Sequence, residues 1–384
     1  MEKRKIRMGM VGGGPGSFIA LVHYNGAVLD GQIELVCGAF SSDPEKSKIA
    51  GKQYFLPPER VYSSYAEMFE KEKTLAPDER MDFVCIATPN HVHYDPARLA
   101  LENGFHVVID KPLTFNVVEA EKLAELVEKT GLVFAVTHAY TAYPMIKEAR
   151  KLIADGHLGK IRKIVVEYPQ GWLSTPLEKG DSVQASWRTD PTRSGKAGCM
   201  GDIGTHAFNL AEYVSGEKVS HLCADLTTFV EGRKLDDDGN VLLRFENGAK
   251  GVLHASQISA GEENNLNIRV YGEKGGIEWH QVEPNTLKVK WLDKPTEIRK
   301  PGNSYVSGVA AYHSRLPFGH PEGLIEAFAN IYRNVATSIQ CRLLGEDIPE
   351  FAIDYPGVQD GLRGMKFIDA LIESNSTEVK WTRF

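Results

Sequence analysis

The pair of residues best suited to do chemistry is an aspartate and a histidine four positions apart. Asp202 and His206 stand in the segment Gly-Asp-Ile-Gly-Thr-His, and if that segment is helical, both side chains lie on one face. An aspartate one turn before a histidine can orient the imidazole, fix its tautomer and raise its basicity. The spacing therefore predicts an acid–base pair. A capping aspartate beside a buried, hydrogen-bonded histidine is the alternative that these residues leave open.

A glycine-rich loop near the start of the chain predicts a dinucleotide site. The apolar run 6–11 leads into Gly-Gly-Gly-Pro-Gly-Ser, a G-x-G-x-x-S pattern, and a helical pattern follows. Glycines let the backbone approach a pyrophosphate, and the N–H groups of a helix N-terminus attract it. A glycine-rich turn without a ligand is the alternative, but the place at the first strand–helix junction favours binding. The expected cofactor contacts are Gly12, Gly14, Pro15, Gly16 and Ser17.

The end of the second expected strand leaves the choice between NAD and NADP open. An acid at this place commonly holds the ribose hydroxyls of NAD, but Ser41 and Ser42 occupy it, and Asp43 comes late, before a proline. Hydroxyl groups would not repel a 2′-phosphate, and Lys46 or Lys48 could reach one. The expected cofactor is therefore NAD or NADP, with contacts from the two serines.

Two further strand ends carry polar residues, after the runs 81–88 and 106–110. In an open α/β sheet the ligand binds beyond the carboxyl ends of the strands, so both segments are expected near the cofactor. His91 and His93 have the spacing of a metal pair, but no third ligand has a recognisable spacing, and no metal is expected. A solvated loop lysine is the alternative for Lys111. The expected contacts here are Thr88, Pro89, Asn90, His93, Asp110 and Lys111.

These residues need a scaffold, and the first half of the chain provides a regular one. Short apolar runs alternate with helical patterns at 18–29 and 116–129, the latter with Asn116 as N-cap and Gly131 as stop. Strands that alternate with helices predict a parallel, doubly wound sheet of the Rossmann type. The expected strands are 6–11, 33–40, 81–88, 106–110 and 132–138.

The pattern of apolar residues and turn signals changes after Tyr143. A helix is expected at 145–155 and an amphipathic helix at 322–339, where apolar residues recur at three-to-four spacing. Between them, turn signals separate strands that predict a mostly antiparallel sheet with an open face. The expected domains are therefore 1–143 and 144–384. The expected strands of the second are 161–168, 241–245, 250–256, 267–271, 276–280 and 287–292.

Composition excludes several kinds of partner. The chain has 384 residues and a net charge of −7, which gives no electrostatic footprint for nucleic acid. No apolar run approaches the 18 or so residues that a membrane-spanning helix requires, and the start of the chain has no signal-peptide pattern. The five cysteines are scattered without a C-x-x-C motif, so a cytoplasmic location is expected.

Taken in order, the glycine loop, Thr-Pro-Asn-x-x-His, the Lys-Pro pair and Gly-Asp-Ile-Gly-Thr-His resemble the Gfo/Idh/MocA oxidoreductases. That family includes glucose–fructose oxidoreductases, inositol dehydrogenases and levoglucosan dehydrogenases. The resemblance spans essentially the whole chain. It implies an N-terminal Rossmann domain, a C-terminal α/β domain with a large open sheet, and the catalytic residues Lys111, Asp202 and His206. Two departures stand out, since Asp110 replaces the usual glutamate and His138 stands where many members have a nearby arginine.

The resemblance also implies the reaction. We expect an NAD(P)-dependent dehydrogenase that oxidises a secondary ring hydroxyl of a sugar, pyranoside or inositol, with His206 as proton acceptor, Asp202 orienting, and Lys111 stabilising charge on oxygen. A redox-neutral glycosidase or lyase and a non-catalytic dinucleotide sensor are the alternatives. A homodimer or homotetramer through the open sheet is expected. The expected substrate contacts, besides Asp202 and His206, are Tyr140, Trp187, Arg188, His320 and Glu322, although Glu322 can equally be a helix-start carboxylate.

Overall fold

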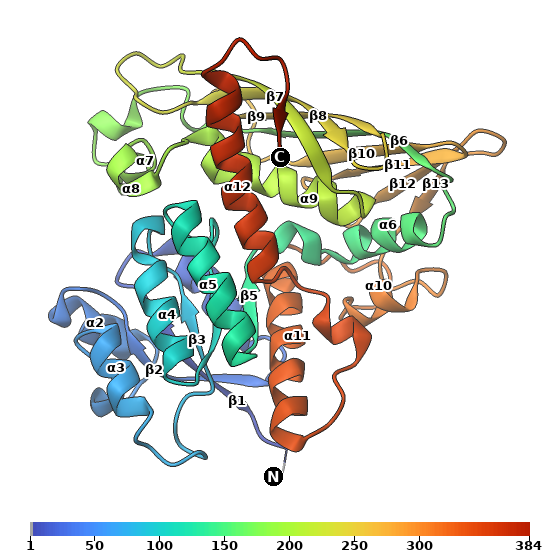
Figure 1. The fold of residues 1–384 in the computed structure, drawn as a ribbon. Coiled ribbons are helices and arrows are strands. Elements are labelled where there is room, and N and C mark those ends of the chain that lie inside the picture. Colours follow the sequence, from blue (N-terminus) through green and yellow to red (C-terminus); the bar gives the residue numbers. More distant parts are fainter. Residues whose placement is uncertain (1–2) are drawn as a thin grey trace. The chain divides into compact units, whose positions relative to one another are not determined.

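The computed structural model describes residues 3–384, which form two compact units (Figure 1). The first unit contains residues 3–139 and Leu324–Leu362, and the second contains Tyr140–Gly323 and Arg363–Phe384. The expected boundary at 143 and 144 differs from this division. Residues 140–143 fall in the second unit, and a later segment returns to the first.

The first unit is built on a parallel sheet of five strands in the order β2-β1-β3-β4-β5. The side chains of β3 are fully buried, as expected for a parallel strand covered on both faces. Strands β2 and β3 lie on opposite sides of β1, so the order in which the chain adds strands reverses between β1 and β3. Ligands bind at such a switch point. The strands are β1 (Ile6–Val11), β2 (Ile33–Ala39), β3 (Phe83–Ile86), β4 (His106–Ile109) and β5 (Phe134–Val136).

Residues at the ends of the helices in this unit determine where the helices begin and end. Asn116 caps α5 by accepting from the Glu119 N–H at 3.0 Å, and Gly131 ends it with φ 62°. Helix α11 packs against α1, where Gly26 allows close approach, since a Cβ there would lie 2.8 Å from Phe328 Cβ. This contact explains why α11 belongs to the first unit. The helices are α1 (Phe18–Val28), α2 (Pro44–Gln53), α3 (Tyr65–Glu72), α4 (Tyr94–Glu102), α5 (Val117–Thr130) and α11 (Leu324–Leu344), with 3-10 turns at Pro58–Arg60, Asn90–Val92 and Glu350–Ile353.

The second unit contains a nine-stranded sheet in the order β13-β12-β11-β10-β6-β9-β8-β7-β14. All neighbouring pairs are antiparallel except β6 and β9, which are parallel. The expected fold class, a Rossmann sheet plus a mostly antiparallel sheet, is confirmed. The strands are β6 (Ile161–Pro169), β7 (Val219–Thr227), β8 (Asp238–Phe245), β9 (Lys250–Ser256), β10 (Asn267–Gly272), β11 (Gly275–His280), β12 (Leu287–Trp291), β13 (Glu297–Arg299) and β14 (Thr382–Arg383).

Helices α6 and α9 lie along one face of this sheet (Figure 1). The sequence alternates accordingly, because Val241 and Leu243 of β8 are buried whereas Asn240 and Leu242 are exposed. Among residues 3–384, no helix is both long and apolar enough to cross a membrane. The helices are α6 (Pro144–Ala154), α7 (Val183–Arg188), α8 (Pro191–Ser194), α9 (Thr205–Ser215) and α10 (Gly308–Tyr312), with short turns at Leu177–Lys179 and Met200–Gly204. Helix α12 (Val358–Asn375) and the turn Ala139–Ala142 begin in the first unit and end in the second.

Candidate active site

The glycine loop lies at the switch point of the first sheet. Gly12 has φ 89°, and a Cβ there would lie 2.5 Å from the Ala87 carbonyl oxygen, at the end of β3. Gly14 has an ordinary backbone, but its Cβ would lie 3.3 Å from the Phe40 carbonyl oxygen and 3.5 Å from Ser41 Cβ. The loop is therefore folded tightly between the ends of β2 and β3, with no room for a side chain at Gly12 and a close contact for one at Gly14.

The first turn of α1 is suited to an anion. Its N-cap, Ser17, makes no side-chain capping hydrogen bond, and no acidic residue stands in the first turn. The N-caps of α2, α3 and α5 all accept hydrogen bonds with their side chains. Gly16 just before it has φ 83° with no atom near the place of a Cβ. Uncapped N–H groups after an open glycine turn fit a pyrophosphate.

The end of β2 carries hydroxyl groups. Ser41 Oγ accepts from the Asp43 N–H at 3.1 Å, and Ser42 is exposed. The Asp43 carboxylate caps α2, accepting from the Glu45 N–H at 3.0 Å and from the Lys46 N–H at 3.4 Å. Because that carboxylate serves the helix, the structure does not place it as the acid that a ribose-binding strand end usually carries.

The segment after β3 is built around buried polar groups. His93 is fully buried, with Nδ1 2.9 Å from the Pro112 carbonyl oxygen and Nε2 2.8 Å from that of Thr88. Its ring therefore ties the loop after β3 to the loop after β4, and burial lowers the pKa of His93. Asn90 is buried as well. Thr88 Oγ1 is buried without a hydrogen-bond partner among residues 3–384, as fits a site completed by a bound group.

The loop after β4 holds Lys111 through its neighbour. Asp110 Oδ1 accepts from the Lys111 N–H and from Thr137 Oγ1, both at 2.9 Å. Burial alone would raise the pKa of Asp110, but its interaction with His23 and the charge of Lys111 hold it below its usual range. His138, after β5, has its pKa lowered to about 3 by burial and by the charge of Lys111. The charge of Lys111 therefore acts on both an ionised carboxylate and a neutral imidazole.

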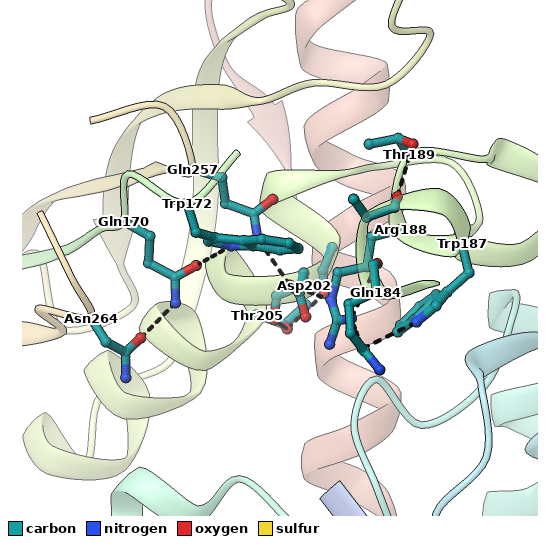
Figure 2. Close-up of polar contacts among 12 residues, drawn as sticks. Gln170, Trp172, Gln184, Trp187, Arg188, Thr189, Asp202, Thr205, Gln257 and Asn264 are labelled. Carbon is teal, nitrogen blue, oxygen red and sulfur yellow. Dashed lines mark hydrogen bonds and ion pairs between the residues drawn. The ribbon is translucent and has the colours of Figure 1, made fainter. Parts of the chain in front are cut away.

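In the second unit, a π-helical turn at Met200–Gly204 runs directly into α9 and carries Asp202 and His206. Asp202 Oδ2 accepts from Arg188 Nε at 3.0 Å and from Gln257 Nε2 at 2.9 Å (Figure 2). The carboxylate is thus fixed by two donors from other segments. The segment itself is anchored by Asp236, which accepts from the N–H groups of Gly198 and Met200 at 2.8 and 2.7 Å.

The surroundings of His206 are aromatic. The imidazole is buried and stands edge-on to the Tyr140 ring, with centroids 4.8 Å apart. The Tyr140 and Tyr168 hydroxyls are hydrogen-bonded to one another, and Tyr168 also donates to Asn264 Oδ1 at 2.7 Å. Burial raises the pKa of both tyrosines, so the rings stay neutral. His206 is therefore a buried imidazole beside two neutral tyrosine rings.

Sequence reasoning missed a set of neutral polar residues beside this pair. Trp172 Nε1 donates to Gln170 Oε1 at 3.1 Å, and Gln170 donates to Asn264 Oδ1 at 2.5 Å (Figure 2). What brings these residues together is the strand pairing. Because β6 and β9 are parallel with Pro169 opposite Ser256, Gln170 and Gln257 both follow strand ends at one edge of the sheet.

Several residues that were expected to contact the substrate interact with other protein groups in the structure. The Arg188 guanidinium lies 4.2 Å from the Trp187 ring as well as on Asp202, so it positions that carboxylate and covers one indole face. Glu322 is buried and accepts from the N–H groups of Arg315 and Leu316, so it closes a loop and stands before α11, outside the helix. His320 is exposed on the same loop.

Asp236 gives a testable pH dependence. Burial raises its pKa to about 6, so the folded state retains a proton that the unfolded chain releases near pH 4. The stability that this proton confers is present at low pH and is lost as the pH rises from 4 through 6, by up to about 3 kcal/mol. Asp236→Asn should flatten the free energy of unfolding over this range in urea titrations, whereas the exposed Asp225→Asn should not. Parallel pH curves for Asp236→Asn and the wild type would contradict this assignment.

Known proteins share this architecture. Residues 6–138 match an oxidoreductase family with an NAD-binding Rossmann fold, and residues 146–278 match the GFO/IDH/MocA C-terminal domain. The uncharacterised oxidoreductase YfiI of Bacillus subtilis is 33% identical over 386 residues, covering 99% of this chain and 97% of the relative.

Two crystal structures are also similar along the whole chain. An oxidoreductase from Sinorhizobium meliloti is 42% identical with a TM-score of 0.88, covering 99% of both chains. An inositol dehydrogenase homologue from Azotobacter vinelandii, in complex with NADH and myo-inositol, is 33% identical with a TM-score of 0.91, covering 99% of this chain and 98% of that one. The resemblance seen in the sequence is confirmed: this chain belongs to the Gfo/Idh/MocA family and is an oxidoreductase with an NAD-binding Rossmann domain.

Proposed function

We propose that this oxidoreductase is a dehydrogenase of neutral cyclic polyols that converts a secondary ring hydroxyl to a ketone. The observation that carries the proposal is the environment of Asp202 and His206. A fixed carboxylate and a buried imidazole stand in the same unit as uncharged amide and indole groups. Such groups suit a ligand with several hydroxyls, because each buried polar group left unpaired would cost about 1–3 kcal/mol.

His206 accepts the hydroxyl proton in this proposal. Asp202, fixed by Arg188 and Gln257, orients either the imidazole or the substrate hydroxyl. Lys111 donates a hydrogen bond to the same oxygen and stabilises the charge that develops on it. A nicotinamide dinucleotide held by the glycine loop at Gly12–Ser17 would supply the hydride acceptor for the carbinol carbon. Loss of one proton and one hydride from the alcohol leaves the ketone, the reduced cofactor and a protonated base.

The charge around Asp202 argues for an uncharged substrate. The Arg188 guanidinium is already paired with this carboxylate at 3.0 Å, so a phosphate or carboxylate on the substrate would gain little from Arg188. Gln170 and Asn264 offer both donors and acceptors, which match hydroxyl groups. Trp172 offers an apolar ring beside them. The Azotobacter vinelandii relative crystallised with myo-inositol supports this substrate class.

Cofactor choice rests on the end of β2, and we propose that both NAD and NADP are accepted. Ser41→Asp should shift the ratio of kcat/KM toward NAD by about tenfold, equal to about 1.4 kcal/mol, because a carboxylate repels the 2′-phosphate. Initial rates with each cofactor measure the ratio, and Ser174→Asp, on a loop of the second unit, is a control. A wild-type preference above about 10³-fold would contradict this interpretation of the strand end.

Assembly and location complete the proposal. The face of the nine-stranded sheet that α6 and α9 leave uncovered presents Leu242 and Val252 within a rim of charged residues. A homodimer or homotetramer formed through this face would cover them. All five cysteines are free thiols, which supports the cytoplasm as the location.

A panel of substrates tests the proposal. We expect absorbance of the reduced cofactor to rise when inositols, pyranoses or pyranosides are added with NAD or NADP. Linear alcohols and phosphorylated sugars should give much lower kcat/KM. Turnover of a linear alcohol with none of any ring polyol would overturn the substrate class. Ring-polyol conversion without net cofactor reduction would indicate the redox-neutral glycosidase or lyase instead.

A further inference from the structure

We propose that His23, a residue of α1 outside the chemistry described above, forms an ion pair with Asp110 and thereby positions Lys111 and sets its charge environment. This inference rests on the proposed role of Lys111. All the residues involved belong to the first unit, so its geometry is complete within that unit.

The contacts form a buried chain across the first unit. His23 is fully buried, its Nε2 lies 3.9 Å from Asp110 Oδ1, and its Nδ1 lies 2.7 Å from the Tyr332 hydroxyl of α11. Tyr332 in turn donates to Cys85 Sγ of β3 at 3.1 Å. Asp110, whose side chain is 15% exposed, ends the chain at the loop that carries Lys111.

The donors along this chain indicate a protonated imidazole. Since the Tyr332 proton goes to sulfur, the Tyr332 oxygen accepts from His23 Nδ1–H. Nε2 lies 3.9 Å from the Asp110 carboxylate, too far for a hydrogen bond but close enough for the negative charge to favour a protonated ring. Burial alone would lower the pKa of His23, but Cys85 and Asp110 raise it to about 10. The imidazolium therefore persists at neutral pH.

Lys111 is coupled to this pair through Asp110, whose Oδ1 accepts the Lys111 N–H. The titratable groups that bear on the pair are Cys85 and Tyr332 next to His23, and Lys111 and His93 next to Asp110. Burial lowers the pKa of His93. The His23 charge therefore cancels that of Asp110, and the lysine ammonium does not face an uncompensated carboxylate.

Removing the His23 charge should change catalysis through Lys111. In His23→Gln, the carboxylate of Asp110 is uncompensated, and the loop that carries Lys111 loses its buried ion pair. With the proposed substrates, His23→Gln should lower kcat about tenfold while the cofactor Kd changes less than twofold. In the double variant His23→Gln, Asp110→Asn, both charges are gone and kcat should recover part of this loss.

The deciding measurement is NMR of the full chain without substrate, which stays decisive even if no polyol is turned over. Histidine-selective 15N labelling should show both His23 ring nitrogens protonated at pH 8. His313→Gln, a buried histidine in the second unit, is the control for loss of packing in the kinetic comparison. A neutral His23 at pH 8, or a kcat unchanged in folded His23→Gln, would overturn the inference.

Discussion

Replacing His206 with alanine is expected to lower kcat by about 10²–10⁴-fold, the usual contribution of a positioned acid–base group. The imidazole is buried against the Tyr140 ring, and alanine has no group that can accept a proton. Cofactor affinity should change little, because His206 is not assigned to the dinucleotide. Steady-state kinetics with the best substrate of the panel, together with calorimetry of cofactor binding, measure both effects.

The control for this variant is His157→Ala, which removes an exposed histidine from the same unit. Asp202→Asn combined with His206→Ala should cost much less than the product of the two single losses, because residues that act as a unit are not additive. Turnover close to wild type in folded His206→Ala would contradict the assignment and move the base role to Lys111.

Gly14→Val is expected to abolish tight binding of the dinucleotide. Gly14 has an ordinary backbone conformation, but its Cβ would lie 3.3 Å from the Phe40 carbonyl oxygen, so the rest of the side chain must project into the loop. Overpacking at this place costs about 2 kcal/mol of folding stability. The loss of affinity comes instead from the side chain that occupies the pyrophosphate position, and we expect binding to be about 30-fold weaker, equal to about 2 kcal/mol, which calorimetry with NAD and NADP measures.

Gly308→Val is the matched control, since no atom lies within 4 Å of the place of its Cβ and it stands in the second unit. Circular dichroism must first show that both variants are folded. Unchanged cofactor affinity in folded Gly14→Val would show that the pyrophosphate does not lie against this glycine.

The first unit was largely predictable because its signals are local. The strand of residues 6–11 was expected with the bounds of β1, and Asn116 and Gly131 end α5 as expected. Helix α11 was predicted from its periodicity, but its return to the first unit was not. That return depends on the close approach at Gly26, a contact between distant parts of the chain that no local pattern encodes.

In the second unit, local patterns found Asp202 and His206 but not what fixes them. Gln257 reaches Asp202 because β9 runs parallel to β6, and a sequence that reads as antiparallel hairpins gives no hint of this pairing. For Glu322 the sequence predicted a role that the structure gives to other contacts. Its type and place predict a substrate contact or a helix-start carboxylate, but its carboxylate accepts from two backbone N–H groups.

The most direct test of the central claim is the stoichiometry of the reaction with the best ring polyol of the panel. Reduced cofactor is measured by absorbance and the organic product by mass spectrometry in the same sample. We expect one reduced cofactor for each ketone that has lost two hydrogens at a ring carbon. A product formed without reduced cofactor, or reduced cofactor formed without a ring ketone, would contradict the account.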